Sequence, residues 1–127
     1  MTPKILVTDI ETSPGLADIW GLWDQNVGLS QLREVTAVIA FAAKWYGEKP
    51  IEFRSDFHDG HEAMIHRAWE LLDEADIVIH FNGKTFDMPH LNREFILAGL
   101  PPYSPVAEID LLQVVKSRFK FMSNKLQ

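Results

Sequence analysis

Residues 4–12, KILVTDIET, decide how this chain folds. The apolar first half of this stretch is typical of a β-strand, and the second half carries two carboxylates two residues apart. Because side chains at positions i and i+2 of a strand point to the same side, Asp9 and Glu11 should project together while Ile10 faces the core. Like charges held side by side repel each other. A bound divalent cation would explain the pair, and a solvated strand end is the plainer alternative.

The composition indicates one globular domain that covers residues 1–127. The chain contains no cysteine, which excludes disulfides, cysteine-ligated zinc and thiol nucleophiles. Its longest apolar run, residues 37–43, is far shorter than the roughly 20 residues that cross a bilayer. The N-terminus reads as a strand and not as a signal peptide. We therefore expect a cytoplasmic protein without a membrane partner.

Charge is distributed unevenly along the chain, whose net charge is −6. Residues 1–110 hold eight Lys or Arg and eighteen Asp or Glu, whereas residues 111–127 hold four Lys or Arg and no acid. A basic segment on an acidic body can mark a phosphate contact. A solvated helix face is the alternative.

Hydrophobic periodicity predicts five strands and three helices. The turn at residues 47–50 favours an antiparallel hairpin, and residues 13–34 suggest a long loop or a short irregular helix. This order predicts an α/β fold with a mixed five-stranded sheet flanked by helices. Ligands of such sheets bind beyond the carboxyl ends of the parallel strands, where Asp9 and Glu11 lie. The expected strands are residues 4–10, 35–46, 51–54, 77–81 and 106–109, and the expected helices are residues 62–75, 86–98 and 111–119.

A third acid follows the fourth expected strand, in the stretch NGKTFD at residues 82–87. Asp87 falls in the first turn of the next helix, where an acid also complements the helix dipole. If the strand at residues 77–81 neighbours the first strand, Asp87 converges with Asp9 and Glu11. Three hard oxygen donors without cysteine suit Mg²⁺ or Mn²⁺.

Together, DIET and NGKTFD resemble the first two motifs of DEDD-type 3′–5′ exonucleases, in the DnaQ-like branch of the ribonuclease-H-like superfamily. The order of elements follows that fold along nearly the whole chain. The stretches WGLWDQNVGL and AAKWYGEK are similar to stand-alone nucleases of tailed bacteriophages. The resemblance implies a ribonuclease-H-like fold and metal-dependent cleavage of nucleic acid.

The same resemblance assigns roles to individual residues. It implies that Asp9 bridges two divalent metal ions, that Glu11 helps to bind one of them, and that Asp87 helps to hold the other. For Phe86, core packing is an equally good interpretation, and for Lys84 plain solvation is. The positions implied to bind substrate are Thr12, Asn82, Lys84 and Phe86.

The chain departs from the family pattern at its C-terminal end. The family has a third motif on a final helix, with a metal-binding Asp preceded by a His or Tyr. No such motif follows Ser123, so we expect a C-terminally truncated exonuclease domain that is either a fragment or a naturally short form. Asp110 ends the fifth expected strand, and we expect it to cap the following helix and not to replace the missing acid.

Three functions are compatible with these residues. The leading hypothesis is a 3′–5′ exonuclease acting on single-stranded or frayed nucleic acid. The alternatives are a ribonuclease-H-like module that binds nucleic acid or a protein without cutting, and a structure-selective endonuclease of the same superfamily. We also expect His80 to be a satisfied core histidine and the four tryptophans to lie in the core. Among the tryptophans, Trp20 and Trp23 have the best claim to stacking on bases.

Overall fold

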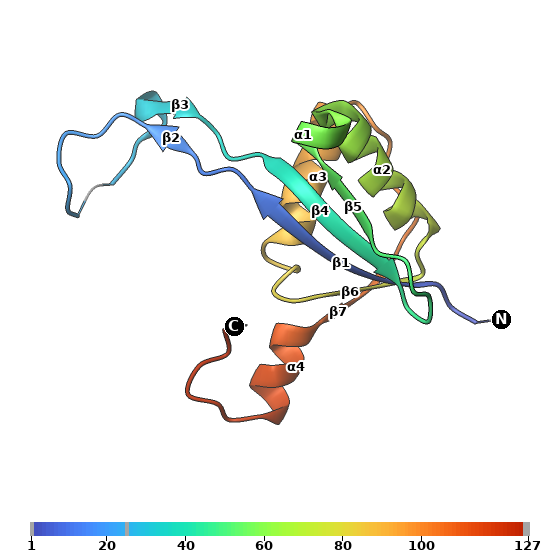
Figure 1. Ribbon diagram of the computed structural model, residues 1–127. Coiled ribbons are helices and arrows are strands. Elements are labelled where there is room, and N and C mark those ends of the chain that lie inside the picture. The colour runs from blue at the N-terminus through green and yellow to red at the C-terminus, as the bar shows by residue number, and fades with distance from the viewer. Residues whose placement is uncertain (1, 25, 126–127) are drawn as a thin grey trace.

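The fold is a mixed five-stranded sheet with its helices gathered mainly on one face (Figure 1). The computed structural model describes residues 2–24 and 26–125. The strand order across the sheet is β5-β4-β1-β6-β7, so β1 is the central strand. The strands are β1 (Ile5–Thr12), β4 (Val38–Trp45), β5 (Glu52–Ser55), β6 (Ile77–His80) and β7 (Ala107–Asp110).

Strand directions divide the sheet into two halves. The pairs β1–β4 and β4–β5 are antiparallel, whereas β1–β6 and β6–β7 are parallel. The predicted mixed sheet and the predicted hairpin after β4 are therefore confirmed. Because β1, β6 and β7 run in the same direction, their carboxyl ends meet at one edge of the sheet.

Two long helices cover one face of this sheet. Helix α2 buries residues three and four positions apart, as its sequence predicts, and together with α3 it closes the core against Leu6, Phe41 and Val78. Helix α4 instead stands away from the sheet, and none of its residues is buried (Figure 1). None of the described helices is long and apolar enough to span a membrane. The helices are α1 (Asp56–Asp59), α2 (His61–Glu74), α3 (Asp87–Leu97) and α4 (Leu111–Arg118).

The opposite face of the sheet is only partly covered by the described residues. Along β6, Val78 and His80 are buried, whereas Ile77 and Ile79 are half-buried. The apolar run at residues 77–81 supplies β6, of which the structure fully buries only every second side chain. The reason is that no long helix packs over the second face within the described part of the chain.

Residues 13–24 and 26–37 belong to a ribbon that extends from the body, which we call the arm (Figure 1). Its two strands, β2 (Leu16–Ala17) and β3 (Leu32–Glu34), pair antiparallel, and a 3-10 turn (Leu29–Gln31) precedes β3. The sequence predicted a loop or an irregular helix here, and the two-stranded pairing was missed because both strands are very short.

The tryptophans divide between the arm and the body. Trp20 is 80% exposed and Trp23 is 82% exposed, so the prediction that they lie in the core is wrong. Trp45 and Trp69 are partly buried against the hydrophobic core, as predicted. The arm that carries these two indole rings reaches beyond the body (Figure 1).

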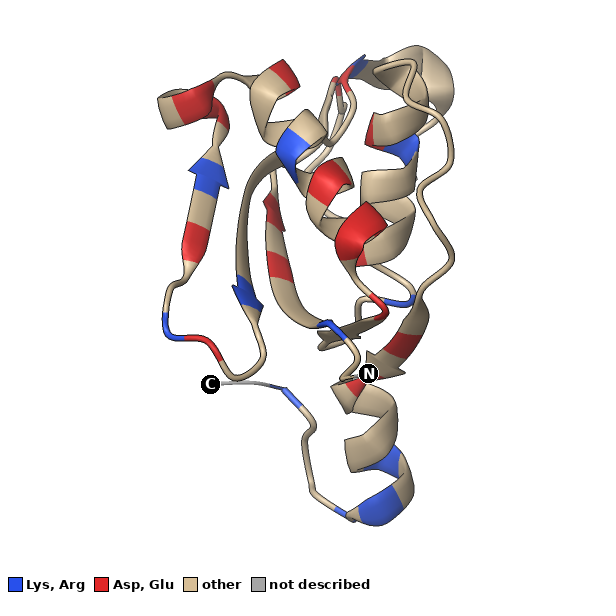
Figure 2. Cartoon of the chain, turned by 90° about the vertical axis from the view of Figure 1, so that its right-hand side faces the viewer, with Lys and Arg blue, Asp and Glu red and all other residues tan. Residues whose placement is uncertain are grey.

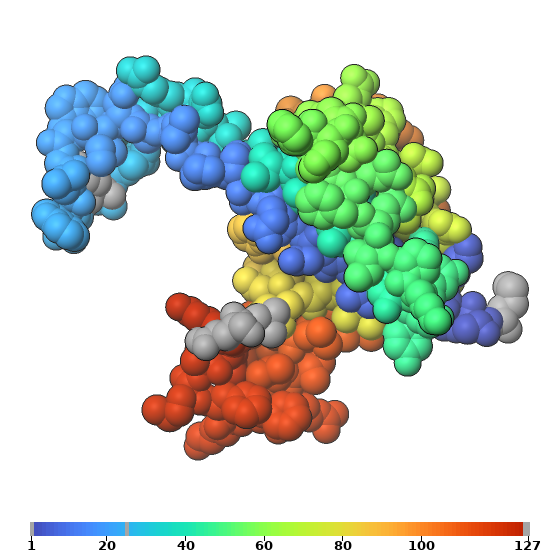
Figure 3. Space-filling view, viewed as in Figure 1, coloured from blue at the N-terminus to red at the C-terminus, as the bar shows by residue number. Residues whose placement is uncertain are grey.

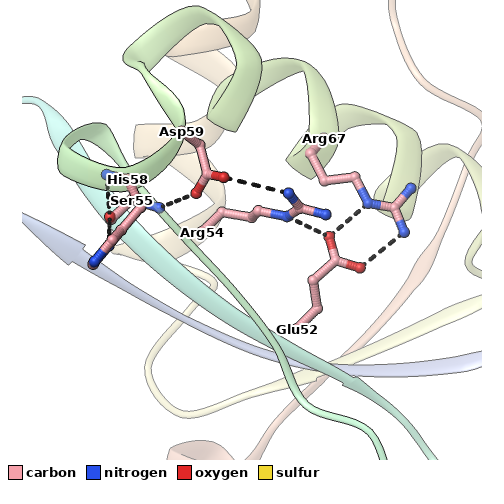
Figure 4. Close-up of polar contacts among 6 residues, drawn as sticks. All are labelled: Glu52, Arg54, Ser55, His58, Asp59 and Arg67. Carbon is pink, nitrogen blue, oxygen red and sulfur yellow. Dashed lines mark hydrogen bonds and ion pairs between the residues drawn. The ribbon is translucent and has the colours of Figure 1, made fainter.

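A polar network joins β5 to the helices that cover it (Figure 4). Arg67 donates to both carboxylate oxygens of Glu52, over 2.6 and 2.9 Å, and Arg54 donates to the same carboxylate over 3.1 Å. These hydrogen bonds, chiefly those from Arg67, lower the pKa of Glu52 against the opposing effect of burial. The network thereby fastens α2 to the edge strand.

We predict that Glu52→Gln lowers the free energy of unfolding by about 1–2 kcal/mol at pH 7, because it removes a charge-assisted pair. Since the folded pKa of Glu52 lies below its unfolded value, the carboxylate stabilises the fold above that unfolded value. The difference between the two proteins should shrink as the pH falls below about 4. Urea unfolding from pH 3 to 8 measures it. Glu62→Gln, at a side chain that is 89% exposed, is the matched control and should change little.

Candidate active site

The alternation of β1 places two carboxylates at the carboxyl edge of the parallel strands. Leu6 and Ile10 are buried under the helices, whereas Asp9 and Glu11 are exposed on the other side of the strand. This confirms the predicted shared direction of Asp9 and Glu11. A register irregularity between Glu11 and Thr12 then turns the chain into the arm.

Asp87 joins this edge from α3, whose first residue it is. Its side chain is only 2% exposed, and its carboxylate accepts a hydrogen bond from the backbone N–H of Ile10 over 3.2 Å. Burial, and after it the charge of Asp9, together raise the pKa of Asp87 to about 6 against the lowering effect of the Ile10 hydrogen bond. The structure therefore brings Asp87 and Asp9 within electrostatic reach of each other.

These groups match the chemistry of a hard divalent cation. The buried Asp87 and the exposed Asp9 interact electrostatically, and a positive ion beside them would favour the ionised form of both. Glu11 lies two residues further along the same side of β1. Within the described residues, no three His, Asp or Glu side chains already gather closely enough to hold an ion together. The structure thus unites Asp9 and Asp87 but does not draw Glu11 into a closed cluster with them.

Asp110 anchors the loop that carries Asp87. Its carboxylate accepts hydrogen bonds from the backbone N–H groups of Asn82 (2.8 Å), Lys84 (3.4 Å) and Leu112 (3.0 Å). Partial burial opposes ionisation, but these three donors outweigh it and lower the pKa of Asp110. The predicted capping of α4 is confirmed. The two bonds to the loop were missed, because sequence spacing does not reveal that the turn after β6 folds back over β7.

His80 supports the same loop from below. It is buried, as predicted, and its Nδ1 accepts a hydrogen bond from the backbone N–H of Gly83 over 3.1 Å. The proton of the neutral ring must then sit on Nε2, which donates to Glu108 over 2.9 Å. A Cβ on Gly83 would lie 2.2 Å from the His80 ring, so only glycine allows this close approach.

The residues expected to bind substrate lie at the end of β1 and in the segment between β6 and α3. Asn82 adopts a left-handed conformation with φ of 59°, and its side-chain oxygen accepts from the Thr85 hydroxyl over 2.8 Å. Lys84 is exposed. Phe86 is 39% exposed and its ring lies 4.5 Å from that of His90, so it is not part of the core. Thr12 is half-buried at the end of β1.

Comparison with known proteins places this architecture in a family. A family model described as RNase_H superfamily matches residues 26–127. The chain belongs to the RNase_H superfamily. The matched range includes Asp87 and Asp110, whereas Asp9 and Glu11 precede it. Membership of the RNase_H superfamily supports a nuclease-type function, and nucleases of this superfamily generally use divalent metal ions.

Solved structures agree on the fold. A family B DNA polymerase from the hyperthermophilic archaeon Pyrobaculum calidifontis is similar to this chain, with a TM-score of 0.64 and 17% identity. The similarity covers 93% of this chain but 16% of the polymerase chain, and at this identity it supports the fold alone. No curated protein matches the sequence.

We predict that Asp87→Asn stabilises the metal-free protein at pH 8. The folded pKa of Asp87, about 6, lies above its ordinary value of 3.8, so the carboxyl group destabilises the fold progressively as the pH rises between these values. One pKa unit is worth about 1.4 kcal/mol, so the effect is on the order of 3 kcal/mol. Asparagine keeps an oxygen that can accept from Ile10. Urea unfolding in EDTA from pH 4 to 8 tests this, and equal pH slopes for the two proteins would contradict it.

We also predict that Asp110→Asn loosens the loop after β6. An amide offers one acceptor oxygen in place of two, so the free energy of unfolding should fall by about 1–3 kcal/mol. Hydrogen exchange should accelerate at the amides of Asn82 and Lys84. Asp76→Asn is the matched control, because Asp76 accepts one backbone hydrogen bond, from Lys4 at the far end of the sheet. Unchanged exchange at both loop amides would show that Asp110 does not anchor the loop.

Proposed function

We propose that this protein is a divalent-metal-dependent 3′–5′ exonuclease that hydrolyses phosphodiester bonds at single-stranded or frayed ends of nucleic acid. The observation that carries the proposal is the buried Asp87, held by the N–H of Ile10 beside the charge of Asp9. Carboxylates that repel each other at the carboxyl edge of parallel strands indicate a functional site, and a bound cation would offset their repulsion. Membership of the RNase_H superfamily supports the nuclease class.

Asp9, Glu11 and Asp87 are the proposed metal ligands, and their oxygen-only chemistry suits Mg²⁺ or Mn²⁺. Two bound ions would activate a water molecule and stabilise the leaving oxygen of an in-line displacement. Asp9 interacts electrostatically with Asp87 and shares a side of β1 with Glu11, which fits it to bridge both ions. Asp87 is the ligand with the most restricted position, since it is buried and hydrogen-bonded to β1.

The surrounding residues are proposed to hold the end of the substrate. Thr12 and Asn82 flank the acids from β1 and from the loop after β6. The exposed ring of Phe86 is available to contact the terminal base, and the exposed Lys84 is available to a phosphate. The hydrogen bonds of Asp110 hold the loop that contains Asn82 and Lys84. Substrate binding would therefore cost less conformational entropy in this loop.

The test uses a single-stranded oligonucleotide labelled at its 5′ end. With Mn²⁺, the protein should produce a ladder that shortens stepwise from the 3′ end. Asp9→Ala should reduce the rate by at least about a hundredfold while leaving the fold intact by circular dichroism. Glu48→Ala, at an exposed acid in the turn between β4 and β5, is the control and should cut at the normal rate.

Each other outcome points to a definite alternative. Undiminished cleavage by Asp9→Ala would refute the proposed site. Cleavage of a circular single strand, which has no end, would identify an endonuclease. Tight binding of the oligonucleotide without cleavage in Mn²⁺ would identify a nucleic-acid-binding module, and calorimetric titration with Mn²⁺ alone would then show whether the acids bind metal.

A further inference from the structure

We propose that the arm and helix α4 form the two sides of a binding path for single-stranded nucleic acid, in which bases stack on Trp20 and Trp23 while phosphates contact the cations of α4. The inference rests on the proposed function for the class of its ligand. It assigns a role to the arm tip and to α4, neither of which contributes to the carboxylate cluster.

Hydrogen bonds brace the arm on both sides of its tip. Gln31 donates from its side-chain nitrogen to the backbone oxygen of Asp18 over 3.0 Å and accepts from the N–H of Gly28 over 2.8 Å. Arg33 pairs with Asp18 over 2.7 Å, which ties the two strands together. These hydrogen bonds brace the two ends of the segment that carries the exposed Trp20 and Trp23.

The chemistry of the arm suits bases better than phosphates. Trp20 and Trp23 expose most of their indole surface, and stacking on such rings tolerates any base. The arm contains no lysine, and its single arginine is paired with Asp18. It therefore has flat aromatic surface to offer a nucleic acid and little positive charge.

Helix α4 and the segment after it supply the charge that the arm lacks. Lys116 and Arg118 end the helix and Lys120 follows it; all three are exposed. Beyond Asp110, the charged residues that Figure 2 shows in this part of the chain are all basic. Among the described residues, none of these three side chains forms an ion pair, so each is available to a phosphate group.

Both sides of the path start at the candidate active site. The arm begins at Ser13, directly after the strand that carries Asp9 and Glu11. Helix α4 begins at its cap Asp110, whose carboxylate also binds the loop leading to Asp87. Figure 3 shows the surface hollowed between the arm and the C-terminal segment, with the loop after β6 at the back of the hollow. A single strand lying in this hollow would lead its end toward the acids.

A protein partner is the competing occupant, because Leu22 and Leu29 of the arm are also exposed. Two observations favour nucleic acid. The arm is continuous with β1, the strand that carries the proposed metal ligands Asp9 and Glu11. The opposite side of the hollow, formed by α4, is basic, whereas residues 1–110 are strongly acidic. This local positive charge is complementary to a polyanion.

The experiment compares two fluorescein-labelled 20-nucleotide probes, oligo-dT and an abasic strand of equal length, by anisotropy in EDTA. The abasic strand keeps every phosphate and lacks the bases. Wild-type protein should bind oligo-dT more tightly than the abasic strand. The double variant Trp20→Ala, Trp23→Ala should lose about tenfold or more in affinity for oligo-dT and bind the abasic strand as before. Trp20→Phe, Trp23→Phe should recover most of the loss.

Substitutions in the basic helix α4 should have a different effect on binding from those in the arm. Lys116→Gln, Arg118→Gln should weaken binding of both probes equally and reduce the salt slope by roughly 1.4, the value expected for two contacts to a single strand. Tyr46→Ala is the matched control, since this exposed ring lies just beyond β4 at the end of the sheet away from the arm. It should bind both probes normally.

Two results would overturn the inference. The first is equal affinity of wild-type and double tryptophan variants for oligo-dT. The second is a concentration-dependent dimer, detected by sedimentation velocity, that dissociates in the tryptophan variant while oligo-dT binding is unchanged; the arm would then be a contact between copies. Failure of the proposed function is distinguishable, because binding through the arm without cleavage in Mn²⁺ would leave this binding path in place and remove the exonuclease.

Discussion

The hydrogen bond from the backbone N–H of Ile10 to the carboxylate of Asp87 is the interaction on which the site depends. The ladder between β1 and β6 reaches only to Val7, so the backbone of Ile10 lies beyond it. A buried N–H without an acceptor is costly, and Asp87 supplies that acceptor from the start of α3. One bond therefore satisfies the central strand, fixes the first turn of a helix, and sets a carboxylate beside Asp9.

This arrangement is held from both sides of the loop after β6. On one side, the Asp110 carboxylate accepts hydrogen bonds from two N–H groups of the loop. On the other side, the His80 ring accepts a hydrogen bond from the N–H of Gly83. As a consequence, Asn82 adopts a left-handed conformation and Gly83 lies in close contact with the His80 ring. Such local irregularity, maintained by its surroundings, is typical of functional loops. The electrostatic cost appears at Asp87, whose pKa is raised chiefly by burial and then by the charge of Asp9.

Sequence reasoning found the parts of this structure that follow from periodicity. The alternation of β1 predicts that Asp9 and Glu11 share a side, and the position of Asp87 at a helix start follows from the apolar pattern of α3. The contacts of Asp110 with the loop depend on how two strand ends come together in space, which no spacing in the sequence reveals. The arm was missed because strands of two and three residues carry no periodic signal. Its tryptophans were assigned to the core because composition alone cannot distinguish a buried ring from one that is presented to a ligand.

Charge explains why the proposed metal and substrate sites belong together. Residues 1–110 carry ten more acids than bases, so a polyanion approaching the sheet edge meets repulsion that only a local positive charge can reverse. Helix α4 supplies such charge on the exposed flank but contributes none beside Asp87. If the protein has the proposed function, metal ions bound by the acids would neutralise the negative charge at the sheet edge. The same ions would attract the terminal phosphate of the substrate. Metal and nucleic acid would then bind cooperatively, each raising the affinity for the other by the same factor.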